Sequence, residues 1–166
     1  MPIDSPLIVA VRQGVYLRAE ELGEYVSGAL NEIGLNTTTE AIEYAAYMEQ
    51  YIMPFDEIPP DRGWIGTMSH GNEMMDVGLT AATWYRCSGG VASYCDSDLD
   101  DLIDEANPLV GDERAAAFAD ITRQFQEAYS VAPILHLAFL YGTAENLIWE
   151  PRLDGFMLVK EMSFGS

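Results

Sequence analysis

Lysine is almost absent from this chain of 166 residues, in which Lys160 is the only one. Lys and Arg together number 8 against 27 Asp and Glu, so the formal net charge is −19. Binding to nucleic-acid phosphates needs clustered basic side chains, and we therefore expect no nucleic-acid partner. The acidic residues predict a well-solvated surface; a salt-adapted source and a preference for cationic ligands are the alternative interpretations.

Long hydrophobic runs and catalytic fingerprints are also missing. The sequence contains no stretch of about twenty apolar residues, which is the length that a transmembrane helix needs. The chain has no phosphate-binding glycine loop, no dinucleotide fingerprint and no nucleophile elbow. The acidic pairs Asp100-Asp101 and Asp104-Glu105 fall on the polar side of an expected helix, which indicates solvation and not acid–base chemistry. We therefore predict a protein that is not an enzyme and needs no cofactor.

Cysteine occurs only twice, at Cys87 and Cys95, within a loop rich in Gly and Ser. Eight positions of separation allow a disulfide, which would be stable in an oxidising compartment. The alternative is two unpaired thiols. The spacing lacks the tight cysteine pairs of zinc sites, so zinc binding by the pair is not expected.

Alternating strand and helix patterns predict an α/β fold in which helices flank a mixed sheet, with 166 residues sufficient for one domain. Expected strands cover residues 7–11, 35–41, 76–83 and 134–140, and expected helices cover residues 20–33, 42–53, 97–106 and 112–128. Ser97 is the expected N-cap of the third helix, and Asn107-Pro108 its end. The run 134–140 is apolar except for His136, so it reads as a strand covered on both faces, with His136 a core residue.

Several segments together resemble one protein family. They are the acidic helix that ends at Ala106, the helix opening Asp112-Glu113-Arg114, the segment Ala132-Pro133-Ile134, the closing Leu153-Asp154-Gly155-Phe156, and, near the start, Gly14-Val15-Tyr16 and residues 22–34. In this order they resemble the C-terminal lobe of extracellular solute-binding proteins of the peptide/nickel-binding class, which serve ABC importers. The resemblance spans nearly the whole chain.

The resemblance implies one lobe of a type II periplasmic-binding-protein fold. Residues 1–140 would form the ligand-binding lobe, and residues 141–166 would cross back towards an N-terminal lobe. The chain would then be a fragment of a longer bilobed protein, periplasmic or extracellular, with its signal peptide upstream. Its partners would be a peptide or similar small solute and, for the full-length protein, an ABC permease.

A candidate ligand site follows from the expected strand 76–83, because ligands of open α/β sheets bind beyond the carboxyl ends of strands. That strand would end at Trp84, Tyr85 and Arg86. In the resembled family a tryptophan here lines the cleft, often with an acidic group that binds a peptide amino end. The acidic group and a long insertion are missing, and Arg86 would suit a carboxylate or another anion. The alternative to a ligand site is that Trp84 and Tyr85 are core residues and that Arg86 is a surface charge.

His70 and Asn72 are candidate polar groups of the same cleft. The spacing of His70, Glu73 and Asp76 also suits metal ligands on a helix, but Gly71-Asn72 indicates a loop, and we predict no metal site. The ligand itself stays open between a peptide, another small solute and a metal chelate.

A freestanding acidic α/β interaction domain without a transport role is the alternative function. If the chain is instead a fragment of a bilobed protein, we expect residues 142–166 to lack support, with exposed apolar side chains that favour self-association: Leu147, Ile148, Trp149 and Phe156.

Overall fold

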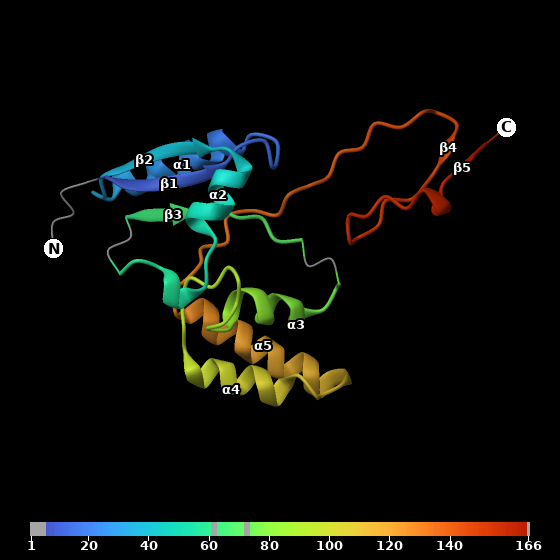
Figure 1. Ribbon diagram of the computed structural model, residues 1–166. Coiled ribbons are helices and arrows are strands. Elements are labelled where there is room, and N and C mark those ends of the chain that lie inside the picture. The colour runs from blue at the N-terminus through green and yellow to red at the C-terminus, as the bar shows by residue number, and fades with distance from the viewer. Residues whose placement is uncertain (1–5, 61–62, 72–73, 166) are drawn as a thin grey trace.

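The computed structural model describes residues 6–60, 63–71 and 74–165. It contains a small parallel sheet flanked by helices, a separate group of helices, and an extended C-terminal segment (Figure 1). The predicted α/β class is therefore confirmed. Within these ranges no helix is long and apolar enough to cross a membrane.

Strand β1 (Leu7–Arg12) is the centre of the sheet, between β2 (Thr37–Ile42) and β3 (Trp64–Gly66). Both pairings are parallel, whereas the sequence predicted a mixed sheet. Val9 lies opposite Thr39 on one side and Ile65 on the other. A central parallel strand is covered on both faces, which explains why three successive residues of β1 have no exposed surface: Val9, Ala10 and Val11.

Helix α1 (Ala19–Glu32) covers one face of the sheet, as its predicted position between two strands requires. Val9, Val11 and Ala19 form the buried cluster beneath it. Gly23 permits the close approach, because a Cβ atom there would lie 2.3 Å from Val11 Cγ2. The helix is followed by Gly34 at φ 92°, a left-handed conformation that glycine adopts without strain.

Helix α2 (Tyr44–Tyr51) packs against β1 and is followed by the short 3₁₀ turn η1 (Phe55–Glu57). The Glu43 carboxylate caps α2 by accepting from the backbone N–H groups of Ala45 and Ala46. Tyr47 is fully buried, and its hydroxyl donates to the Thr67 carbonyl at 3.1 Å. Since side chains alternate along a strand, Arg12 leaves β1 on the face opposite Val11, and its guanidinium lies near the Tyr47 ring.

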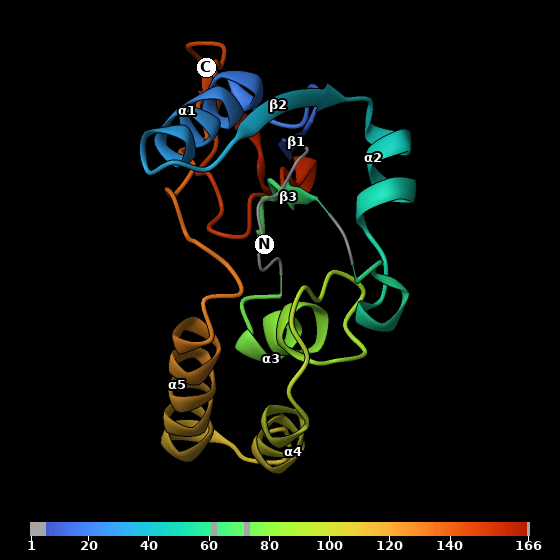
Figure 2. The ribbon, with the colours of Figure 1, turned by 90° about the vertical axis from the view of Figure 1, so that its left-hand side faces the viewer.

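The remaining helices form a second group, apart from the sheet in both views (Figures 1 and 2). Helix α3 (Val77–Thr80) widens into a π-helical turn, η2 (Ala81–Tyr85), and is followed by α4 (Ser97–Ala106) and α5 (Gly111–Glu127). Both α4 and α5 agree with the predicted helices. Their common core consists of Ala81, Tyr85, Leu99, Ile103, Ala106, Phe118, Ile121 and Phe125.

The strand predicted at residues 76–83 is wrong, because this stretch is helical. The Asp76 carboxylate caps the helix by accepting from Gly78 N–H at 2.7 Å. Ala81 and Tyr85, four residues apart, are buried in the helical core, and Val77 packs against it. Spacing of four residues between buried positions is typical of a helix. The strand was predicted because residues 76–83 are small and apolar, a property that does not distinguish a buried strand from a buried helix.

The strand predicted at residues 134–140 is also wrong. This stretch follows an extended course without strand pairing, and its large apolar side chains are exposed, including Phe139 (68%) and Leu140 (88%). His136 is exposed as well and is not a core histidine. An apolar run becomes a buried strand only where a sheet edge accepts its backbone hydrogen bonds and a helix covers it.

We call residues 131–165 the C-terminal arm. In Figure 1 it leaves α5, passes the sheet and projects away from the rest of the molecule. It ends in two antiparallel strands, β4 (Leu147–Ile148) and β5 (Ser163–Phe164), with a 3₁₀ turn η3 (Val159–Glu161) before β5. Arg152 pairs with Asp154 and Glu161 inside this loop.

Alkaline pH should weaken the fold through Tyr47. Burial raises the pKa of Tyr47 to about 12, although Arg12 acts in the opposite direction. The free phenol of the unfolded chain ionises near pH 10, so this stabilisation is present below pH 10 and lost between pH 10 and 12. We expect a loss of roughly 2–3 kcal/mol in the free energy of unfolding, absent in Tyr47→Phe. Urea unfolding at several pH values measures this loss, and Tyr25→Phe, at an exposed tyrosine, serves as control. If Tyr47→Phe and Tyr25→Phe lose the same free energy of unfolding between pH 10 and 12, Tyr47 is not the cause.

The C-terminal arm should cause self-association. Leu153 is 90% and Val159 79% exposed, and such apolar surface favours contacts between molecules. In sedimentation velocity we expect a mass that increases with concentration, and a monomer for the double variant Leu153→Ser/Val159→Ser. Leu17→Ser changes an equally exposed leucine (84%) outside the arm and should leave association unchanged. A wild-type chain that sediments as a monomer at every concentration would refute the expectation.

Candidate functional site

The carboxyl ends of β1 and β3 lie at the same edge of the sheet, because the strands are parallel. Arg12 ends β1, and the segment after β3 contains Thr67, Ser69 and His70. Thr67 fixes this segment to β1, since both its backbone N–H and its hydroxyl donate to the Ala10 carbonyl. Ligands of open α/β sheets bind at such an edge, which makes these residues candidates for a ligand site.

His70 and Trp84, both predicted as site residues, lie side by side. Their ring centroids are 5.5 Å apart, and His70 Nε2 shares a hydrogen bond of 2.7 Å with Thr80 Oγ1. His70 comes from the segment after β3, whereas Thr80 and Trp84 come from α3 and η2. This contact therefore joins the sheet to the helical group.

A hydroxyl hydrogen-bonded to an imidazole also occurs in nucleophilic triads, where a third group, a carboxylate, orients the imidazole. In the described ranges, however, no carboxylate contacts His70 to orient it as a base. We therefore interpret His70 and Thr80 as polar binding groups beside the Trp84 ring.

Tyr85 and Arg86 do not join this site. Tyr85 is buried in the helical core, where its ring stacks on Phe125 at 4.0 Å. Arg86 follows η2, not a strand end, and already binds the Asp104 carboxylate at 2.8 Å. The hydrogen bond that Arg86 donates to Asp104 raises the pKa of Arg86. The anion site predicted at Arg86 is thus filled by the chain itself; Asn72 lies outside the described residues.

Arg12 is a candidate site residue that the sequence interpretation did not include. It is only 8% exposed, and Nη2 donates to Ser69 Oγ at 3.2 Å. The guanidinium carbon lies 5.9 Å from the centre of the Tyr44 ring and 5.7 Å from that of Tyr47, within cation–π range. A charge directly after the apolar run 7–11 could have marked this position, because it falls at the carboxyl end of an expected strand.

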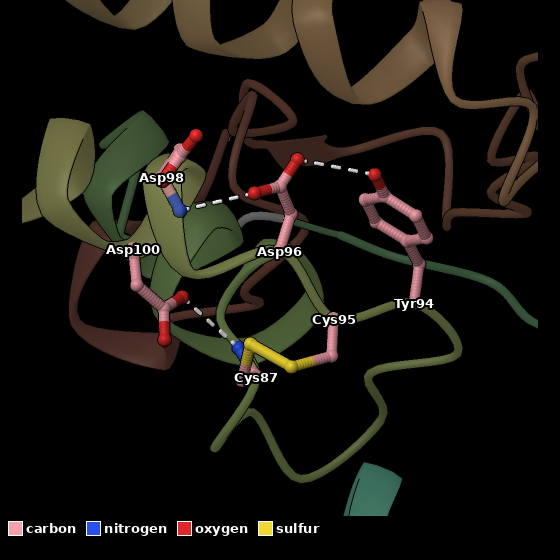
Figure 3. Close-up of a disulfide and its surroundings, with 6 residues drawn as sticks. All are labelled: Cys87, Tyr94, Cys95, Asp96, Asp98 and Asp100. Atoms are coloured by element: carbon pink, nitrogen blue, oxygen red, sulfur yellow. Dashed lines mark hydrogen bonds between the residues drawn. A yellow bond between two sulfur atoms is a disulfide. The ribbon is translucent and has the colours of Figure 1, made fainter.

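A disulfide between Cys87 and Cys95 closes the loop between η2 and α4 (Figure 3). The Asp100 carboxylate of α4 accepts from Cys87 N–H at 3.0 Å and so holds the loop against the helix. Gly89 lies tightly against the end of η2, since a Cβ atom there would be 2.5 Å from the Thr83 carbonyl oxygen. The loop is therefore a structural support for η2, which presents Trp84.

The N-cap of α4 is Asp96, one residue before the predicted Ser97. One oxygen of the Asp96 carboxylate accepts from Asp98 N–H at 3.0 Å, and the other accepts from the Tyr94 hydroxyl at 3.1 Å (Figure 3). The hydrogen bond that the Tyr94 hydroxyl donates to Asp96 raises the pKa of Tyr94. Aspartate and serine are both good caps, so local sequence could not distinguish the two positions.

The metal spacing of His70, Glu73 and Asp76 finds no geometric support in the part of the chain that can be described. Asp76 caps α3 and pairs with Arg114 at 2.9 Å. The hydrogen bond from Gly78 N–H, and to a smaller extent that from Arg114, lower the pKa of Asp76. Glu73 lies outside the described residues. No group of three His, Cys, Asp or Glu residues among those described could hold a metal ion.

Two hollows of the described surface lie away from these residues. One, of about 550 Å³, is lined by Glu145, Asn146, Ile148 and Gly165 of the C-terminal arm. The other, of about 220 Å³, lies between α4 and α5. Neither is lined by Arg12, His70 or Trp84, so the candidate site is not part of these hollows.

The candidate site therefore consists of Arg12 and Ser69, with His70, Thr80 and Trp84 beside them. It offers a cation, hydroxyl groups, an imidazole and an indole ring, which suit a polar or anionic organic ligand. Comparisons with protein-family models, curated proteins and solved structures found no match to this chain. Its function must therefore be argued from the site and from the sequence resemblance.

Removing the disulfide should destabilise the helical group. The loop-entropy relation gives about 2.5 kcal/mol for a loop of this length, and we expect that loss in Cys87→Ser/Cys95→Ser. Urea unfolding measures it, with the exposed loop substitution Ser88→Ala as control. If the double variant and the oxidised wild type unfold at the same urea concentration, the disulfide does not stabilise the fold.

Proposed function

We propose that this chain is the ligand-binding lobe of an extracellular solute-binding protein for ABC-type import. In this proposal its fold is that of one lobe of a type II periplasmic-binding protein. The order of the segments that resemble that family motivates the proposal. Its main structural support is the joining of His70 and Trp84 next to the carboxyl edge of a parallel sheet. The ligand is a small solute, of which a peptide is one candidate.

In this proposal the lobe supplies one wall of a cleft, and a second lobe supplies the other. A hinge motion closes the two walls, traps the ligand and creates the surface that the permease recognises. Trp84 would cover a flat or apolar part of the ligand, while His70 and Thr80 would exchange hydrogen bonds with it. Most of the affinity would come from burial between both walls, so the isolated lobe should bind weakly.

A second candidate is an acidic interaction domain without a transport role. The C-terminal arm favours it, because Leu153, Val159 and Phe164 are exposed there and a protein partner could cover them. The two candidates differ in gene context, since the transport role requires a reading frame that includes a second lobe and adjacent permease genes.

Native mass spectrometry of the parent protein, purified from the periplasm without denaturation, tests the transport proposal. We expect a co-purifying small molecule that dissociates on unfolding, and a reduced bound fraction in Trp84→Ala. Val110→Ala, a similarly apolar but 78% exposed position far from the site in sequence, serves as control. A parent protein with no bound mass and no affinity for any solute tested would reject the proposal.

Isothermal titration of the 166-residue chain with the molecule identified in this way tests the single-wall geometry. We expect binding too weak for titration at micromolar concentrations, because one wall buries only part of the ligand. Micromolar affinity of the isolated chain would show that the lobe is a complete site by itself.

A further inference from the structure

We propose that Arg12 is the carboxylate-binding group of this site, so that the ligand carries a carboxylate which the guanidinium recognises. The inference deepens the proposed function and rests on it for the identity of the site. The environment of Arg12 differs from that of the other arginines in the described ranges.

Each of the other described arginines is paired with an acidic side chain of the protein. The pairs are Arg18–Glu21, Arg86–Asp104, Arg114–Asp76, Arg123–Asp120 and Arg152–Asp154. Arg12 has no carboxylate partner in the described ranges, although the chain contains 27 acidic residues. It is nevertheless the more buried residue, since 8% of Arg12 is exposed, whereas each of the five is half-buried or exposed.

Burial without a counter-charge is unfavourable for a guanidinium, which is always charged in proteins. Nη2 bonds Ser69, whereas Nε is buried without a hydrogen-bond partner. The Tyr44 and Tyr47 rings compensate only in part, since they carry no net negative charge to balance that of the guanidinium. A bound carboxylate would supply the missing negative charge and acceptor atoms.

Ser69 fits the same ligand. Its hydroxyl accepts from Arg12 Nη2 and retains its own proton, which it can donate to a carboxylate oxygen. The carboxylate would accept from Arg12 Nη1, which makes no hydrogen bond to any described residue, and from Ser69 Oγ.

A carboxylate fits better than a phosphate for electrostatic reasons. The site offers one cation, and Arg12 with its neutral neighbour Ser69 balances a single negative charge. The chain as a whole has a charge of −19, which repels a dianion more strongly than a monoanion. Tyr44 is 51% exposed beside the guanidinium, so its ring can also contact the organic part of a carboxylate ligand.

Titration of the ¹⁵N-labelled 166-residue chain with propionate tests the inference by NMR. The probe signal is the Nε–Hε cross-peak of Arg12, assigned by its loss in Arg12→Lys. We expect this peak to move in a saturable way, with a Kd on the order of 1–10 mM for a single charge-assisted contact. Neutral propionamide should not move it, and chloride at the same ionic strength should move it much less.

Two variants with the same chemical change provide the control. Arg12→Lys keeps the charge but loses the planar fork, and we expect propionate to bind about tenfold more weakly, followed through the amide peak of Ser69. Arg123→Lys makes the same change at an exposed arginine on α5, already paired with Asp120, and should leave propionate binding unchanged. Circular dichroism verifies that each variant is folded.

Failure of this inference is distinguishable from failure of the proposed function. An Arg12 peak that stays fixed in propionate, or moves equally in chloride, overturns carboxylate recognition, as does equal binding by the two lysine variants. If native mass spectrometry of the parent then finds an uncharged ligand, the transport proposal stands without Arg12 as its anion site. If propionate binds at Arg12 but the parent carries no solute, the anion site is supported and the transport proposal fails.

Discussion

The central position of β1 is the constraint on which the rest of the structure depends. It bonds to β2 on one side and β3 on the other, and Val9 and Val11 face α1 while the opposite face lies against α2. Because the strand is surrounded, its register with both neighbours is fixed by burial. That register places Arg12 at the carboxyl edge of the sheet, where its guanidinium donates to Ser69 Oγ at 3.2 Å.

A second constraint joins the sheet to the helical group. His70 contacts both Thr80 and Trp84, while the disulfide loop and Asp100 support the end of η2. Polar groups at this junction are therefore held in place from two sides. The C-terminal arm is different, since it has few buried contacts and many exposed apolar side chains. Such a segment gains stability mainly from whatever covers it in the assembled state.

The sequence interpretation succeeded where local signals act alone. Helix α4 has its apolar spacing, a cap and a proline stop within a few residues, and Gly34 marks the end of α1. It failed at residues 134–140, where an apolar run suggested a strand, although a strand exists only with a partner edge. It also failed at Arg86, because nothing local indicated that Asp104, eighteen residues further on, would bind this arginine.

The sequence by itself determined the α/β class, the positions of β1, β2, α1, α2, α4 and α5, and the acidic character of the surface. These follow from periodicity, caps and composition, which are properties of neighbouring residues. Only the tertiary structure decided that Tyr85 belongs to the core, that His70 meets Trp84, and that Arg12 is buried without a carboxylate. Burial and ion pairing depend on contacts between residues distant in the chain, and those contacts exist only once the elements have packed.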